Sequence, residues 1–161
     1  MANIELLEQM IQPVLTIRVK TTMDLLPKLI GESFMQITSY LNELGEGPIG
    51  APYAAYYNMD IQNVEVEVGF PVAGLFPDRD KIRAGLIPPG KVASYMYKGP
   101  YSEMESAYQE IINWIADHGY ERSDVYYEYY YNSPGEVEES ELLTRIVIPL
   151  KRNKVKQQQN D

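Results

Sequence analysis

Polar and apolar side chains alternate along residues 14–20, which predicts a β-strand. Apolar side chains at helical spacing follow, with Asp24 as the expected N-cap and Gly45 as the residue that ends the helix. Two further strands are predicted at 52–60 and 64–72, where three residues between them indicate a hairpin. The first part of the chain is therefore predicted to run strand, helix, strand, strand.

The same order of elements occurs a second time. A strand is predicted at 91–98, a capping-box pattern at Ser102 opens a helix that Gly119 ends, and strands follow at 125–132 and 142–150. One such unit cannot bury both of its faces, so we expect two units to pair about a pseudo-two-fold axis. We predict an α+β fold, in which a duplicated strand–helix–strand–strand unit forms a curved antiparallel sheet of about eight strands with two helices on one face.

The length of 161 residues favours one domain, which we place at 1–152 with halves at about 13–75 and 86–152. The segment 73–86 is rich in charge, Gly and Pro, and is expected to be an exposed linker between the halves. The polar, aperiodic residues 153–161 are expected to be a disordered tail.

Composition narrows the chemistry. The chain has no cysteine and one histidine, His118, so thiolate nucleophiles and multi-histidine metal sites are excluded, and we predict no metal and no cofactor. His118 precedes a glycine that ends a helix, where capping is a better interpretation than catalysis. We find no signal peptide and no apolar stretch long enough to span a bilayer, so we expect a cytoplasmic, bacterial-type protein with no membrane contact.

The charge is strongly negative. Residues 1–150 hold 10 basic and 22 acidic side chains, which repel nucleic acid and suit a cationic partner. Glu67 in the first half corresponds to Arg145 in the second, and the two are either a cross-axis ion pair or unrelated surface charges.

Tyrosine is abundant, with 14 residues against 3 Phe and 1 Trp. A strand over YYEYYY places Tyr126, Glu128 and Tyr130 on one face. In the first half, Ala54 matches Glu128 and Tyr56 matches Tyr130, so this face holds a single carboxylate among aromatic hydroxyls. Under the helices such a site attracts a flat, apolar cation through Coulomb and cation–π interactions. The alternative is a solvated glutamate among tyrosines whose hydroxyls face water.

Five segments occur in a fixed order around the two predicted helices. They are 53–60, 64–72, 87–101, 126–134 and 143–149. Together they resemble the GyrI-like small-molecule-binding domain, the effector-binding domain of multidrug-responsive regulators, over most of the chain. That family has the doubled fold predicted above and includes effector domains of transcription activators, gyrase-inhibitory proteins, sequestering proteins and hydrolases of cyclopropane-bearing toxins. No DNA-binding segment precedes residue 14, so a stand-alone member without direct nucleic-acid binding is expected.

The resemblance implies a pocket with Glu128 at its floor, where the carboxylate meets the ligand cation and tyrosines of neighbouring strands form a cage. Trp114 is expected either to cover this site or to be partly buried elsewhere, and Phe76 either to plug the core or to close a pocket. The candidate ligand-binding residues are Glu128, Tyr56, Tyr97, Tyr130, Tyr126, Trp114 and Phe76.

Three functions remain open from the sequence. The first is binding of amphipathic, often cationic aromatic small molecules, for drug or toxin sequestration or sensing. The second is a hydrolase that opens strained-ring electrophilic toxins, with Glu128 as general base and a tyrosine as proton donor. The third is inhibition of DNA gyrase through an acidic surface that includes the loop 136–141.

Overall fold

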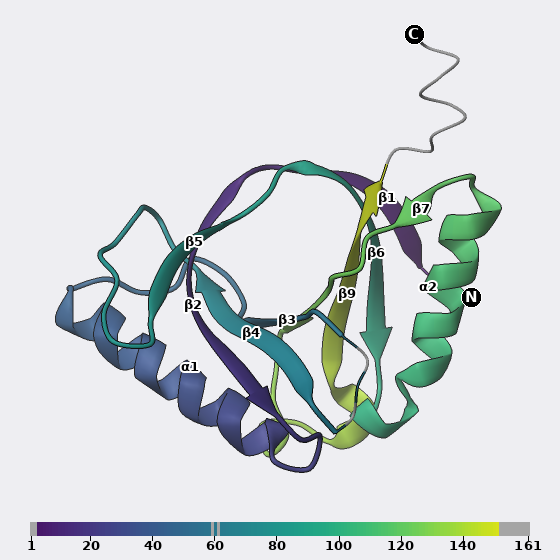
Figure 1. Ribbon diagram of the computed structural model, residues 1–161. Helices are drawn as coiled ribbons and strands as arrows, with labels where there is room; N and C mark the ends of the chain where they lie inside the picture. The colour runs from purple at the N-terminus through teal and green to yellow at the C-terminus, as the bar shows by residue number, and fades with distance from the viewer. Residues whose placement is uncertain (1–2, 59, 61, 152–161) are drawn as a thin grey trace, which may run out of the picture.

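A computed structural model describes residues 3–58, 60 and 62–151, and the predicted tail at 153–161 lies outside them. Two helices flank a strongly curled antiparallel sheet (Figure 1). The helices are α1 (Leu26–Glu43) and α2 (Glu105–Asp117), with short 3₁₀ turns η1 (Tyr101–Glu103) and η2 (Glu139–Glu141). The strands are β1 (Ile4–Gln9), β2 (Gln12–Thr21), β3 (Tyr53–Tyr56), β4 (Val64–Pro71), β5 (Arg83–Ile87), β6 (Gly90–Lys98), β7 (Glu121–Arg122), β8 (Tyr126–Tyr130) and β9 (Leu143–Lys151).

The sheet has the duplicated order that the sequence predicts. Eight strands of the described chain run β1-β6-β9-β8-β3-β4-β2-β5, and the short β7 pairs with the outer part of β9. The two halves meet where β3 pairs with β8, and there Ala54 lies directly opposite Glu128. These are the two residues that match each other between the halves, so the pseudo-two-fold axis passes beside them.

Both helices lie on the outer side of the curl, α1 against β2 and β4 and α2 against β6 (Figure 1). Under α1, Leu15, Ile37 and Leu41 form a buried cluster, and under α2, Ile111 and Ile146 belong to the corresponding one. The inner side has its own buried cluster, which includes Tyr53, Tyr127 and Val147. Within the described residues, no helix is long and apolar enough to cross a membrane.

Both helices end at the glycines that the sequence predicts. Gly45 and Gly119 have φ angles of 71° and 78°, which glycine adopts without steric cost, and the backbone bonds of the two turns match the Schellman pattern. The predicted N-terminal caps are wrong. Asp24 accepts the Thr22 hydroxyl instead of capping α1, and Ser102 lies within η1, so α2 begins three residues later without a side-chain cap.

Two edge strands are additional to the prediction. β1 leads into β2 but pairs with β6, whereas β5 leads into β6 but pairs with β2, so each edge strand belongs to the opposite half. The prediction of an exposed linker at 73–86 is therefore wrong for its last residues, which form β5. Phe76 in the same segment packs against the cluster under α1, which corresponds to its expected core-plugging role.

Candidate functional site

Glu128 lies in the middle of β8, at the centre of the sheet and on its outer face. On that face it is flanked along the strand by Tyr126 and Tyr130, while Ala54 of β3 and Ile146 of β9 are its neighbours across the strands. Tyr126 packs against the clusters of both halves, so this part of β8 lies between the areas covered by α1 and α2.

The Glu128 carboxylate accepts two tyrosine hydroxyls. Tyr108 of α2 donates to Oε2, and Tyr130 donates to Oε1 at 2.9 Å. The Tyr56 hydroxyl lies 3.3 Å from that of Tyr130. Since the single hydroxyl proton of Tyr130 is given to Glu128, Tyr56 is the donor in this second contact. Among the described residues, no Lys, Arg or His forms an ion pair with Glu128.

Aromatic faces surround the carboxylate. Tyr56 stacks on Tyr126 with ring centroids 5.5 Å apart, and Tyr108 meets Tyr126 edge-on at 5.2 Å. Tyr101 of η1 approaches Tyr130 edge-on at 6.1 Å and is 42% exposed, so it lies at the solvent side of the group. We call Glu128 and these rings the Glu128 cluster. Its five tyrosines are Tyr56, Tyr101, Tyr108, Tyr126 and Tyr130.

Burial raises the pKa of Glu128 above its ordinary value, although the hydroxyls of Tyr108 and Tyr130 act in the opposite direction. Burial and the nearby Glu128 charge also raise the pKa of Tyr126 to about 12 and those of Tyr108 and Tyr130 well above the ordinary tyrosine value. The tyrosines therefore stay protonated and act as donors at neutral pH. The cluster is an acidic, aromatic and partly solvent-accessible site, and the described residues supply its carboxylate with hydroxyl donors but with no ion-pair partner.

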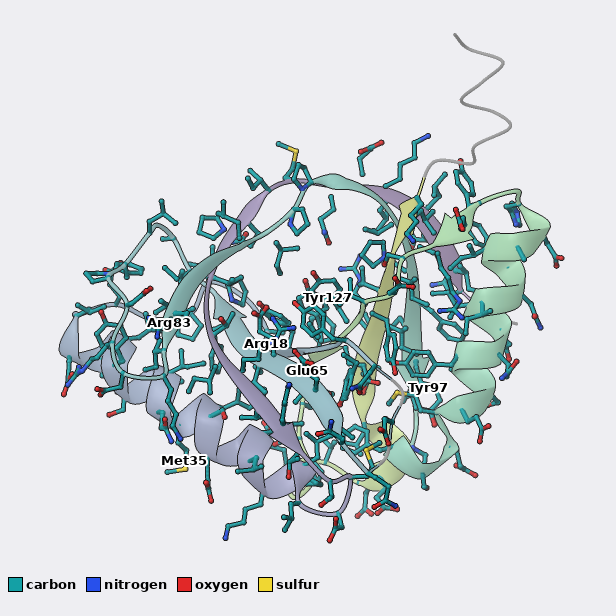
Figure 2. All side chains as sticks on the ribbon, in the orientation of Figure 1. Arg18, Met35, Glu65, Arg83, Tyr97 and Tyr127 are labelled. Carbon is teal, nitrogen blue, oxygen red and sulfur yellow. The ribbon has the colours of Figure 1, made fainter. Side chains whose placement is uncertain are left out.

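The structure brings together four of the seven candidate residues: Glu128, Tyr56, Tyr126 and Tyr130. Tyr97 lies on the α2 side of the sheet (Figure 2), opposite Thr144, and its hydroxyl donates to the Pro100 carbonyl at 2.6 Å. Since Thr144 is in turn opposite Tyr130, Tyr97 is two strands away from β8.

Trp114 is near the far end of α2, where it stacks on His118 with centroids 4.0 Å apart. Nδ1 of His118 also lies 2.8 Å from the Trp114 carbonyl oxygen, a contact typical of a helix end. Trp114 packs partly buried against the cluster under α2, and Phe76 is under α1. Neither is among the residues that donate to or stack within the Glu128 cluster.

Sequence reasoning missed Tyr108 and Tyr101. Tyr108 belongs to the apolar stripe of α2 with Ala107, Ile111 and Ile115, and it is the one residue of these four with a hydroxyl group. A polar tip on an otherwise aliphatic stripe was the available signal. Among the described residues, no three His, Cys, Asp or Glu side chains lie close enough to hold a metal ion.

Of the two interpretations of Glu67 and Arg145, the cross-axis ion pair is wrong, because the two side chains do not lie within ion-pair distance of each other. Glu67 lies beside Tyr57, whose hydroxyl is 3.5 Å from its carboxylate, whereas Nε of Arg145 donates to Oγ of Ser94 at 2.7 Å. The two side chains keep separate local partners on the inner side of the sheet.

Two strand–helix–strand–strand units that share one curled sheet define the structural class of this protein. A family of small-molecule-binding domains matches it. The chain matches the GyrI-like small molecule binding domain over residues 2–151 and belongs to that family. No curated protein sequence is similar enough to count as a further relative.

Solved structures share the fold at low sequence identity. The C-terminal domain of EcmrR is 21% identical with a TM-score of 0.78, covering 94% of this chain and 98% of that domain. In a DNA complex of EcmrR the TM-score is 0.80 at 20% identity, covering 94% of this chain but only 58% of the EcmrR chain. A hydrolase from Listeria innocua is 14% identical with a TM-score of 0.71, covering 92% of this chain and 91% of that one. SAV2435 bound to tetraphenylphosphonium is 12% identical with a TM-score of 0.58, covering 92% and 94%.

Proposed function

We propose that the protein binds amphipathic aromatic cations at the Glu128 cluster and thereby sequesters or senses them. The observation that carries this proposal is a partly buried carboxylate that accepts two tyrosine hydroxyls, has no cationic partner among the described residues and is surrounded by aromatic rings.

The physics favours a cationic ligand over a neutral one. Removing a carboxylate from water costs free energy unless an opposite charge or hydrogen bonds compensate, and here the hydroxyls compensate only in part, since the pKa of Glu128 stays raised. A bound cation supplies the missing charge, and each well-placed ring adds about 0.5–2 kcal/mol of cation–π attraction. The exposed Tyr101 lies where such a ligand would enter.

The family supports binding of small molecules in general. Among proteins of the same fold, SAV2435 is known with tetraphenylphosphonium, an aromatic cation. That likeness is one of fold, so the choice of ligand for this chain depends on the Glu128 cluster itself.

Calorimetric titration with tetraphenylphosphonium tests the proposal in the unaltered protein and in two matched variants. Glu128→Gln keeps the size and an acceptor oxygen but removes the charge, and is expected to weaken binding about 10- to 100-fold. Glu67→Gln makes the same change at another partly buried glutamate of the sheet, beside Tyr57, and is expected to leave the affinity within about twofold. Equal affinities of Glu128→Gln and the unaltered protein would remove the basis of the proposal.

Hydrolysis is a second candidate, favoured by the raised pKa of Glu128 and the two hydroxyls at its oxygens. In this reaction Glu128 takes a proton from water, the water oxygen bonds to the strained-ring carbon, and a tyrosine protonates the group that departs as the ring bond breaks. Incubation with a cyclopropane-bearing electrophile and mass spectrometry decides between the two. More than one equivalent of hydrolysed product, lost in Glu128→Gln, would establish catalysis, whereas product limited to one equivalent or none would exclude it.

Gyrase inhibition depends on the acidic loop at 136–141. Two of its four glutamates have local partners, since Glu136 accepts the backbone N–H and hydroxyl of Ser133 and Glu141 pairs with Lys98 at 2.9 Å. A supercoiling assay at moderate salt would support this role only if the protein inhibits the enzyme.

A further inference from the structure

The inner side of the curled sheet contains a cavity of about 450 Å³, on the opposite face from Glu128. It lies where the chain crosses between the halves, since residues of β1, of the β1–β2 turn and of β5 border it. In Figure 1 these crossing segments form an arch over the curl, and Figure 2 shows Tyr127 of β8 on the inner side of the sheet, where it belongs to the buried cluster described above. The volume falls in the range of about 300–1,000 Å³ typical of small-molecule sites.

Most of the wall is apolar. Leu7, Ile87, Val92 and Val147 contribute aliphatic side chains from four different strands. The polar side chains of this wall include Arg145 of β9 and two tyrosines, Tyr129 and Tyr131. Gln9 and Gln12 also border the cavity, and their side-chain amides donate to backbone carbonyl oxygens. A largely apolar cavity with a small number of polar groups is typical of a site that orients an amphipathic ligand.

Arg145 is held in place without being neutralised. Its Nε donates to Ser94 Oγ at 2.7 Å, which fixes the plane of the guanidinium group. Arg18, Arg79 and Arg83 each pair with a carboxylate, but within the described residues Arg145 has no carboxylate at ion-pair distance. Its remaining N–H groups are therefore available to a ligand.

The two tyrosines add further donors at the same place. Tyr129 lies directly opposite Arg145 across the strands, and Tyr131 is two residues further on, on the same side. In the part of the chain that the structure describes, neither hydroxyl has a hydrogen-bond partner. Glu8 also borders the cavity, but its side chain is exposed and lies opposite Lys91.

We propose that this cavity is a second binding site, which takes a small amphipathic molecule with a carboxylate group. Arg145 and the hydroxyls of Tyr129 and Tyr131 bind the carboxylate, and the aliphatic wall packs against the apolar part. The site has the opposite polarity to the Glu128 cluster and lies on the opposite face, so its occupation does not depend on that cluster binding cations.

The test compares two isosteric probes, 2-naphthoate and the uncharged 2-naphthamide, in titrations of the whole protein followed by NMR. This method measures the millimolar to micromolar affinities expected of fragments this small. In the unaltered protein we expect the carboxylate to bind about 10-fold or more tightly than the amide, and its addition to shift the signals of Tyr129 and Val147. Arg145→Gln is expected to weaken naphthoate binding about 10- to 100-fold and to leave naphthamide binding unchanged.

Two variants serve as controls. Arg83→Gln removes an arginine that pairs with Asp78 and does not border the cavity, and Glu128→Gln removes the charge of the other site, so both should bind naphthoate normally. Equal affinity for the two probes in the unaltered protein would overturn the proposal even if Arg145→Gln failed to fold. Displacement of naphthoate by tetraphenylphosphonium from the same residues would overturn it as well.

Discussion

The hydroxyl of Tyr108 couples α2 to the charge of Glu128, and its removal is the most informative perturbation of the Glu128 cluster. Tyr108→Phe keeps the ring that meets Tyr126 edge-on and deletes only the donor to Oε2. Glu128 then keeps a single hydroxyl, that of Tyr130.

The size of the effect follows from the charge of the acceptor. A hydrogen bond to a charged group contributes about 1.5–3 kcal/mol to stability and one to a neutral group about 0.5–1.5 kcal/mol. Tyr108→Phe should therefore lower the free energy of unfolding by about 2 kcal/mol when position 128 is glutamate and by about 1 kcal/mol in the Glu128→Gln background. The double-mutant cycle should give a coupling energy of about 1 kcal/mol.

Urea unfolding of the four proteins of this cycle at pH 8 measures that coupling. Tyr95→Phe is the matched control, because the Tyr95 hydroxyl donates at 3.2 Å to Glu110, whose side chain is exposed, and its loss should cost less than about 0.5 kcal/mol. Additive effects of Tyr108→Phe and Glu128→Gln would show that the bond does not hold a charged carboxylate, and would refute the electrostatic description of the cluster.

Three further predictions follow from the structure. Because burial raises the pKa of Glu128, tetraphenylphosphonium affinity should fall on acidification at a pH above the ordinary glutamate range, and titrations from pH 8 to pH 5 should show no such fall in Glu128→Gln. Because folding raises the pKa of Glu128, ionisation of this carboxyl group lowers the stability of the folded protein as pH rises, and Glu128→Gln should make that decrease smaller. The same dependence of the melting temperature on pH in both proteins would contradict this. Gly69→Ala should lower the unfolding free energy by about 1–3 kcal/mol, because a Cβ there would lie 2.8 Å from Thr16 Cγ2 and 2.9 Å from the Leu15 carbonyl oxygen, and an unchanged urea midpoint would refute that packing.

Most of the fold could be predicted from the local spacing of apolar residues along the chain. Residues 17–21 of β2 and 64–68 of β4 alternate between more and less buried positions, and each helix buries one stripe, so these patterns are visible in the sequence without knowledge of their partners. The alternation along β8 likewise separates Glu128 from its neighbours Tyr127 and Tyr129, and the structure places them on opposite faces.

Features that depend on distant partners could not be predicted in this way. β1 and β5 are edge strands with mixed or exposed side chains, and each forms only because it pairs with a strand of the opposite half. The contact of Tyr108 with Glu128 depends on how α2 docks on the sheet, which helical spacing does not specify. For the same reason, sequence could not decide whether Trp114 faces the site or stacks on His118.

The most direct test of the central claim is a crystal structure of the protein with tetraphenylphosphonium. We expect the phosphonium within about 6 Å of ring centroids of the Glu128 cluster and its charge facing the Glu128 carboxylate. A cation found in the inner cavity beside Arg145, or one bound with the Glu128 cluster left empty, would contradict the account.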